Sequence, residues 1–167
     1  MRIKSYTRAV FSCIFCLIWL WPLVVNASSD ATPLLTVVAS EMSHSANSQV
    51  TLDRTALLAL PQASMESKVP WHDESARFEG PLISSLMKHL DIRGDTLVVT
   101  GLDGYSTRIS LVEAFETEAM LALRCNDKPI DVREFGPLIL LYPQGHGLSS
   151  QQLLFRTVWQ VAHITVE

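Results

Sequence analysis

The sequence is poor in cysteine and in positive charge. Cys13, Cys16 and Cys125 are its only thiols, and its 13 Lys plus Arg are outnumbered by 17 Asp plus Glu. It also lacks a Gly-x-Ser-x-Gly elbow, a Walker loop and a His-Glu-x-x-His pair. The five histidines are scattered and show no metal-ligand spacing. The sequence therefore shows none of these common signatures of hydrolases and nucleotide-binding proteins. Its histidines give no case for a metal site.

The first 27 residues have the pattern of a secretory signal. A basic segment at residues 2–8 precedes an apolar run over residues 9–25, and the following residues suit cleavage after Ala27. The alternative is a retained membrane anchor, but a run of about 17 residues is at the lower limit for spanning a bilayer. Polar residues also follow the run at once. We therefore predict a periplasmic protein that is cleaved after residue 27 and is not inserted into the membrane.

Cleavage would leave a short acidic chain with a single thiol. Cys125 alone would stay in the mature protein, residues 28–167, so no intramolecular disulfide could form. This length suffices for one domain with its own core. The signal takes three basic residues with it, which leaves 10 Lys plus Arg against 17 Asp plus Glu and a net charge of −7. That balance argues against nucleic acid and anionic lipid as partners.

The order of apolar and turn-forming residues predicts an α+β domain that is β-rich with two short helices. Asp53 suits the N-cap of a helix over residues 54–60, and a second helix begins at Pro81 and runs to Leu90. Strands are expected over residues 34–38, 65–69, 96–100, 105–111, 138–142 and 157–166. Residues 120–125 and 130–132 are expected to form a hairpin around the turn at 126–129.

Aromatic side chains near loops and strand ends are the most promising binding groups. Flat heteroaromatic ligands stack on rings and are oriented by a few polar groups. Trp71 suits a pocket rim or the edge of a core, whereas core packing is expected for Tyr142 and Trp159. Arg133 and Arg156 are guanidinium donors near the same loops, although a surface position would explain each. The aromatic set comprises Trp71, Phe78, Tyr105, Phe135, Tyr142 and Trp159.

Two further residues receive structural interpretations. Cys125 ends an apolar segment beside Arg124, but neighbouring residues of a strand point to opposite faces. We therefore expect the thiol to pack as a small apolar group and not to act as a reactive thiolate. His146 lies between two glycines, and we expect a solvated turn there and not a metal ligand.

Five segments occur in an order that resembles the sulfite oxidase-type molybdopterin-binding superfamily. The first is Phe78-Glu79-Gly80-Pro81-Leu82 and the second is Asp103-Gly104-Tyr105. The others are the segment from Leu121-Ala122 to residue 130, the segment from Gly136-Pro137 to Pro143, and the closing residues 158–166. The resemblance covers residues 70–167 and implies a sulfite oxidase-like fold with a pocket for a pterin.

One departure from the family changes the implied function. Its catalytic members carry a molybdenum-binding cysteine upstream of the Phe-x-Gly element, and residues 34–77 contain none. The chain is similar to small exported members that bind a pterin without catalysis, with no molybdenum expected. The resemblance implies that such members pair with a membrane sensor protein, which is a cyclic-dinucleotide enzyme or a histidine kinase.

The resemblance also implies roles for individual side chains. Trp71 or Tyr105 would stack on the pterin ring, and Asp103 would accept hydrogen bonds from its amino edge. Arg133 or Arg156 would contact a carbonyl or hydroxyl group of the ligand. Two alternatives stay open: a small molybdopterin-dependent oxidoreductase with another metal ligand, and an adaptor whose pocket is filled by its own side chains.

Overall fold

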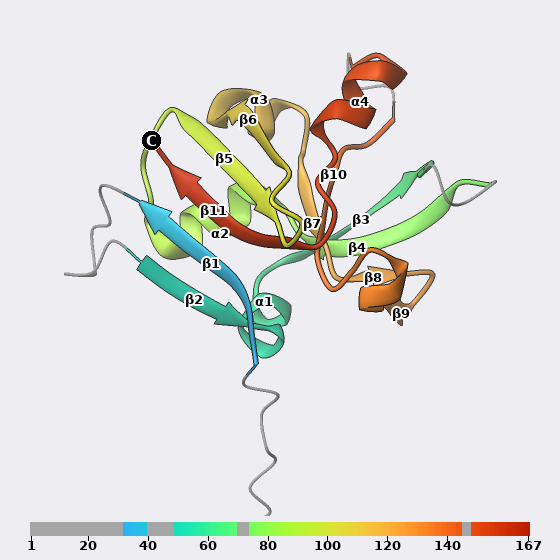
Figure 1. Ribbon diagram of the computed structural model, residues 1–167, viewed down its shortest axis with the longest axis horizontal. Coiled ribbons are helices and arrows are strands. Elements are labelled where there is room, and N and C mark those ends of the chain that lie inside the picture. Colours follow the sequence, from blue (N-terminus) through green and yellow to red (C-terminus); the bar gives the residue numbers. More distant parts are fainter. Residues whose placement is uncertain (1–31, 40–48, 70–73, 145–147) are drawn as a thin grey trace, which may run out of the picture.

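The structure is a computed structural model that describes residues 32–39, 49–69, 74–144 and 148–167 (Figure 1). Its sheets and short helices confirm the predicted α+β class. No helix within these ranges is long and apolar enough to cross a membrane. In chain order the elements are β1 (Pro33–Ala39), β2 (Gln49–Asp53), α1 (Arg54–Ala59), β3 (Gln62–Ser67), β4 (Ala76–Pro81), α2 (Ile83–Leu90), β5 (Thr96–Gly101), β6 (Ser106–Ser110), α3 (Leu111–Glu116), β7 (Met120–Ala122), β8 (Arg124–Cys125), β9 (Lys128–Pro129), the 3₁₀ turn η1 (Val132–Glu134), β10 (Ile139–Leu141), α4 (Ser150–Arg156) and β11 (Val161–Val166).

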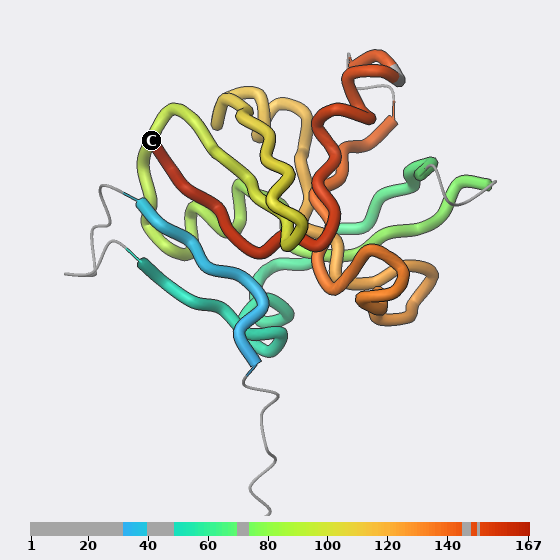
Figure 2. Tube along the Cα trace, viewed as in Figure 1, coloured from blue at the N-terminus to red at the C-terminus, as the bar shows by residue number. Residues whose placement is uncertain are grey.

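The largest sheet has five strands in the order β2-β1-β11-β5-β6. β1 pairs with β11 in parallel, and the other neighbours are antiparallel. The first and last strands of the described chain therefore run side by side in the sheet (Figure 2). Alternate residues of the strands, such as Leu35 and Val37 in β1 and Leu97 and Val99 in β5, are buried on one face. This alternation is typical of a sheet with a single face in the core.

Four strands form a second sheet in the order β3-β4-β8-β9, and β7 and β10 form a two-stranded ribbon. The predicted hairpin is present in shortened form, because β8 and β9 pair across Asn126 and Asp127. Their φ angles of 47° and 65° suit a tight two-residue hairpin turn. The prediction extended the hairpin arms too far, since β7 pairs with β10 and not with residues 130–132.

The two predicted helices are present with one shifted boundary. Asp53 caps α1 by accepting a hydrogen bond of 2.7 Å from the backbone N–H of Ala56. α2 begins at Ile83, two residues later than predicted, because Pro81 still belongs to β4. Asp91 ends α2 in the left-handed conformation, with a φ of 48°.

The structure contains two further helices, α3 and α4, although only two helices were predicted. Both follow a serine that caps them: Ser110 accepts from the N–H of Glu113, and Ser149 accepts from the N–H of Gln152. In α4 the side chain of Gln152 also bonds back to Ser149, which completes a capping box. The predicted strand over residues 157–166 is correspondingly shorter and starts at Val161.

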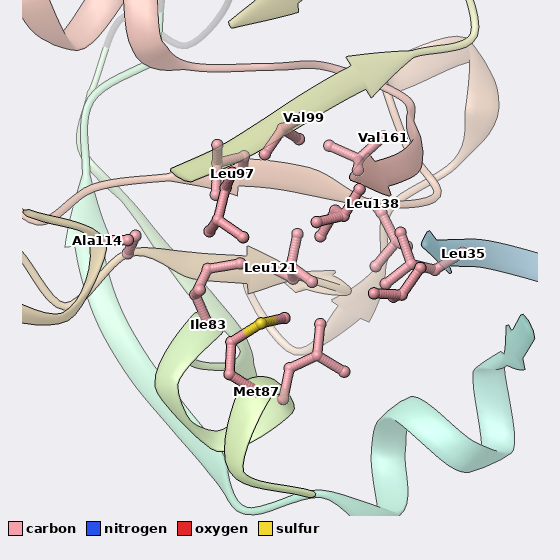
Figure 3. Close-up of a cluster of buried hydrophobic side chains, with 14 of the residues drawn as sticks. Leu35, Ile83, Met87, Leu97, Val99, Ala114, Leu121, Leu138 and Val161 are labelled. Carbon is pink, nitrogen blue, oxygen red and sulfur yellow. The ribbon is translucent and has the colours of Figure 1, made fainter. Parts of the chain in front are cut away.

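The β7–β10 ribbon separates two apolar cores. The main core lies between the five-stranded sheet, the ribbon and α2 (Figure 3), where Leu121 and Leu138 of the ribbon region meet Ile83. Met120 and Ile139 face the second, smaller core on the other side of the ribbon. Both ribbon strands are buried at every residue, which explains their continuous apolar sequence.

Candidate functional site

The Asp103-Gly104-Tyr105 segment forms the tight turn between β5 and β6. A carboxylate oxygen of Asp103 accepts a hydrogen bond of 2.9 Å from the backbone N–H of Tyr105. Gly104 has a φ of +83°, which a residue with a side chain adopts only with strain. Gly101, just before the turn, lies so close to Trp159 that a Cβ on it would stand 2.6 Å from the Trp159 carbonyl oxygen and 2.9 Å from the Asp103 carboxylate. The turn therefore brings Asp103 next to the segment that carries Trp159.

α4 is tied to the same end of the sheet by two side chains from the predicted set. The hydroxyl of Tyr105 donates a hydrogen bond of 2.7 Å to the carbonyl oxygen of Phe155. The guanidinium of Arg156 forms an ion pair with Glu113 on α3, and both side chains are about three-quarters buried, with 26% and 28% exposure. The ring of Tyr105 is still 40% exposed. The structure thus places Asp103, Tyr105, Arg156 and Trp159 around one edge of the five-stranded sheet, and we refer to these four side chains as the edge site.

Trp159 of the edge site forms an aromatic pair with Phe135. The rings of Phe135 and Trp159 have centroids 5.3 Å apart and planes inclined by 55°. Phe135 and Gln160 both have positive φ angles, 67° and 48°, and the N–H of Gln160 donates a 3.0 Å hydrogen bond to the carbonyl of Phe135. Such conformations are strained for residues other than glycine. The side-chain amide of Gln160 also bonds to the Val132 carbonyl, which fixes η1 against this segment.

Phe78 and Tyr142, in contrast, lie in the interior. Phe78 is 1% exposed in the second core, and Tyr142 is 1% exposed in the main core. The Tyr142 hydroxyl has no hydrogen-bond partner among the described residues, and burial raises its pKa. The structure therefore packs both rings within the protein, which is the role expected for Tyr142 and differs from the binding role considered for Phe78.

Of the remaining predicted residues, Arg133 is not a member of the edge site. Arg133 is exposed on η1, beside the Val132 carbonyl that Gln160 binds. Trp71 lies outside the described residues, as does His146. Their proposed contacts with a ligand stay predictions.

A shallow groove lies beside the β5–β6 turn, and Leu102 of this turn is one of its lining residues. Its volume is about 350 Å³, and its walls come from β1, β11, the β5–β6 turn, η1 and Pro137. Apolar residues dominate the lining, together with Thr36 and His163. No residue of the edge site lines it. The groove and the edge site are therefore formed by different residues.

The sequence over residues 35–160 matches the family model described as the oxidoreductase molybdopterin binding domain. The chain belongs to this family. In this molybdopterin-binding domain the edge site uses the Asp103-Gly104-Tyr105 element, and the Phe78 element supplies part of the second core. The family match therefore agrees with the resemblance found in the sequence.

One solved structure shows the same fold in a larger protein. The chain is similar to the sulfane dehydrogenase SoxCD from Paracoccus pantotrophus, with a TM-score of 0.59 and 14% sequence identity. The match covers 79% of this chain and 37% of the SoxCD chain, so this molybdopterin-binding domain corresponds to well under half of that chain. Among curated proteins, none matches the sequence significantly.

The thiol of Cys125 is a poor fit to the anchor that a molybdenum centre needs. Metal-binding thiols act as thiolates, which nearby positive charge favours and burial disfavours. Cys125 pairs with Phe78 across β8 and β4 and is half-buried. Burial raises the pKa of its thiol, and the negative charge of Glu134 raises it further. Within the described ranges no group of three His, Cys, Asp or Glu side chains could hold a metal ion.

The residues present fit a bare pterin better. The edge site offers a half-exposed ring in Tyr105, a carboxylate in Asp103 and a guanidinium in Arg156. These are the stacking, accepting and donating groups that a flat heteroaromatic ligand requires. In a pterin-binding protein they would hold and orient the ring system, and no metal chemistry would be needed.

Several residues that shape the site were missed by sequence reasoning. Glu113 and Phe155 matter because they anchor Arg156 and Tyr105. A signal for both was present, since Ser110 three residues before Glu113 and Ser149 three before Gln152 are helix-start patterns. The sequence does not predict the positive φ of Phe135, because bulky residues rarely adopt that conformation.

Proposed function

We propose that this chain is an exported, non-catalytic pterin-binding protein that reports the presence of a pterin to a membrane signalling partner. Membership of a molybdopterin-binding family supports a pterin as the ligand. The position of Cys125 supports the non-catalytic part, because it is the only cysteine beyond residue 16 and it follows the Asp103-Gly104-Tyr105 element, whereas the catalytic cysteine would precede Phe78. Burial and the negative charge of Glu134 also raise the pKa of its thiol, which disfavours the thiolate. A molybdenum centre without a thiolate would lack its protein anchor and electronic tuning.

The edge site would recognise the pterin through three kinds of contact. The ring of Tyr105, together with Trp159 or Trp71, would stack on the bicyclic system. The Asp103 carboxylate has two oxygens, and one bond from the Tyr105 N–H leaves capacity to accept from the pterin amino edge. Arg156 has five N–H donors, so it could contact a ligand carbonyl while it stays paired with Glu113.

The nature of the bound ligand gives the first test. The protein should be purified from the periplasm, and its bound material analysed for pterin fluorescence and for molybdenum by mass spectrometry. We expect a pterin with no stoichiometric molybdenum. Stoichiometric molybdenum would overturn the non-catalytic assignment, and the absence of any pterin after reconstitution would overturn the pterin assignment.

Paired aromatic variants give the second test. Tyr105→Ala, alone and together with Trp71→Ala, should weaken pterin binding in a fluorescence titration by at least about tenfold, because stacking on a ring contributes on the order of 1 kcal/mol or more. Phe115→Ala is the matched control, since Phe115 is 43% exposed on α3, close to the 40% of Tyr105, but lies outside the edge site. Unchanged affinity in the double variant would rule out the stacking role.

Signalling requires a partner that distinguishes the liganded from the empty protein, because only differential binding can shift an equilibrium. We expect a membrane sensor, a cyclic-dinucleotide enzyme or a histidine kinase, to co-purify with the tagged protein from cell envelopes in one ligand state only. Equal recovery with and without added pterin would contradict a reporting role.

A second candidate is a small molybdopterin-dependent oxidoreductase. The description of the family and the sulfane dehydrogenase neighbour favour it. It requires a metal ligand other than an upstream cysteine, and the purified protein should then contain molybdenum and transfer electrons to an acceptor dye. The same metal analysis therefore separates the two candidates.

A further inference from the structure

β3 is an outer strand of the second sheet, and its free edge is open within the described chain. It pairs on one side only, with β4, and the pairing covers all six of its residues without a shift in register. No described residue outside β4 bonds to its backbone. Figure 1 shows β3 and β4 extending together away from the main sheet. Such an open edge is a template for a further strand.

The hydrogen bonds of β4 show which backbone groups of β3 point to the open edge. The carbonyl oxygens of Arg77 and Glu79 accept bonds of 2.8 and 2.9 Å from the segment around β8, so both residues direct their backbone groups away from β3. Backbone direction alternates along a strand, so Phe78, which lies between them, bonds to its register partner on β3. The neighbours of that partner, Ser64 and Glu66, therefore direct their N–H and C=O groups to the open edge.

The two faces of β3 differ in polarity. Ala63 and Met65 are half-buried and pack against the second core, whereas Ser64 and Glu66 are exposed on the opposite face. Side chains of a neighbouring strand alternate in the same way. A strand added at the open edge would therefore place apolar side chains beside Ala63 and Met65 and polar side chains beside the other two residues.

Glu66 gives the open edge a negative charge. It lies opposite Arg77 in the register of β3 and β4. The Arg77 guanidinium, however, pairs with Glu79 and Asp127. Within the described chain Glu66 has no ion pair. A lysine or arginine on an added strand would pair with it, because opposite charges on neighbouring strands attract.

The other outer strands of the two sheets carry features that discourage pairing. β9 consists of only two residues, Lys128 and Pro129. In the main sheet β6 lies beside α4 and carries Arg108, and the pairing of β2 with β1 includes a shift in register. β3 has no proline, lysine or arginine and is the longest of these four strands. It is therefore the outer strand best suited to accept a partner.

We propose that the open edge of β3 binds an extended segment of the membrane signalling partner, which adds to the second sheet as a further strand. This inference deepens the proposed function, because the identity of the partner rests on it. The segment pairs through its backbone with Ser64 and Glu66 and carries a lysine or arginine opposite Glu66. Its apolar residues lie beside Ala63 and Met65. An extended peptide fits this edge because it supplies alternating N–H and C=O groups at the spacing of a strand.

Amide hydrogen exchange, followed by NMR on the exported protein, tests the edge with a defined probe. The probe is a capped peptide of about six residues, the length of β3, in which valines alternate with threonines and one lysine. In the free protein we expect fast exchange at the N–H groups of Ser64 and Glu66 and slow exchange at those of Ala63 and Met65. The peptide should slow exchange at Ser64 and Glu66. A control peptide with glutamate in place of lysine should bind about fivefold more weakly.

Variants of the two outward-facing residues separate backbone pairing from charge. Ser64→Pro removes an N–H that faces the open edge, where proline is tolerated, and should weaken binding of the lysine peptide by at least about tenfold. Ser64→Thr is the matched control, since it keeps the N–H and suits a strand, and it should bind as the parent does. Glu66→Lys should reverse the preference between the two peptides, because it inverts the charge and leaves the backbone unchanged.

Each outcome decides the question. Absence of binding up to about 1 mM lysine peptide overturns the proposal, as does binding that leaves the exchange at Ser64 and Glu66 fast. If their exchange slows with rising protein concentration in the absence of peptide, a second copy occupies the edge and the assignment to a partner is overturned. If Ser64→Pro fails to fold by circular dichroism, the peptide preference of Glu66→Lys decides alone.

The partner itself gives the last measurement. The membrane protein that co-purifies with the tagged parent should also be recovered with Ser64→Thr and be lost with Ser64→Pro. Equal recovery with both variants would overturn docking at β3. Pterin titration of both variants should match the parent, because β3 contributes no residue to the edge site. Peptide binding without pterin binding would refute the pterin assignment alone, so the two failures are distinguishable.

Discussion

The aromatic and polar residues selected from the sequence divide between two regions of the molecule. Phe78 and Tyr142 are packed in the interior, whereas Tyr105 and Arg156 stand at the edge of the main sheet and are fixed by polar bonds to α3 and α4. The interior residues can support a ligand only through the stability of the fold. The edge residues can touch one directly. Substitutions should therefore separate the two regions by whether they change stability or affinity.

The largest effect is expected in the interior. Phe78→Ala removes a ring that is 1% exposed from the second core and should lower the free energy of unfolding by about 3–5 kcal/mol. Urea denaturation measures the loss, with Phe115→Ala on the exposed face of α3 as a control that should change little. Pterin affinity per folded molecule should stay at the parent value. If Phe78→Ala kept its stability but lost its pterin affinity, Phe78 would act on the ligand, and the assignment of interior residues to stability would be wrong.

The edge ion pair should give an intermediate effect on stability and a clear effect on affinity. Arg156→Gln leaves the three-quarters-buried Glu113 without its partner and should cost about 1–2 kcal/mol. Arg108→Gln is the control, because its pair with Glu167 is far more exposed, at 65% and 48%. Thermal unfolding and pterin titration together should show loss of both properties in Arg156→Gln and of neither in Arg108→Gln. Equal behaviour of the two variants would contradict a ligand role for Arg156.

Removal of a single hydroxyl tests the edge site more finely. Tyr105→Phe deletes the hydrogen bond to the Phe155 carbonyl and should lower stability by about 1 kcal/mol. The stacking ring is kept, so pterin affinity should change much less than in Tyr105→Ala. If Tyr105→Phe weakens binding as much as Tyr105→Ala does, the hydroxyl itself contacts the ligand or holds α4 in the binding conformation.

The smallest effect is a pH dependence at Cys125. Burial raises the pKa of this thiol in the folded protein, so the folded state holds its proton where the unfolded state has already lost it. Stability from the neutral thiol is complete below the unfolded pKa of about 8.5 and is lost as the pH rises through the higher folded value. Urea denaturation between pH 7 and pH 10 should show a shallower decline for Cys125→Ser. A steeper decline in that variant would indicate a thiol that is stabilised as a thiolate.

Strands β1, β5, β6 and β11 of the main sheet and helix α1 were predicted, because local signals and tertiary packing agree there, whereas β2 was not predicted. Strands β1 and β5 are runs of branched apolar residues, and Asp53 is a helix cap in both the sequence pattern and the structure. The hairpin arms were misjudged because residues 120–123 are apolar enough to serve any buried strand. Only the tertiary pairing of β7 with β10 decides their partner.

The sequence suggests which side chains could contact a ligand, but it does not predict how they are arranged. Apolar sequence around Phe78 and Tyr142 allows either a core or a pocket wall, and only the three-dimensional packing shows that both rings are buried. The Ser110 and Ser149 patterns indicate where α3 and α4 begin, but they do not indicate that Arg156 of α4 meets Glu113 of α3. Contacts between residues so far apart in the chain produce no periodic pattern in the sequence from which they could be predicted.

The position of β11 has a consequence for the order in which the chain can fold. β11 lies between β1 and β5, and Thr36 on β1 pairs with His163 close to the end of the sequence. Contacts between residues so distant in the chain form slowly, because a long loop must close before they contribute. The main sheet can therefore be completed only after the chain is available as far as β11. If the chain is exported as proposed, this late closure would keep the segment between β1 and β11 unfolded until β11 has crossed the membrane.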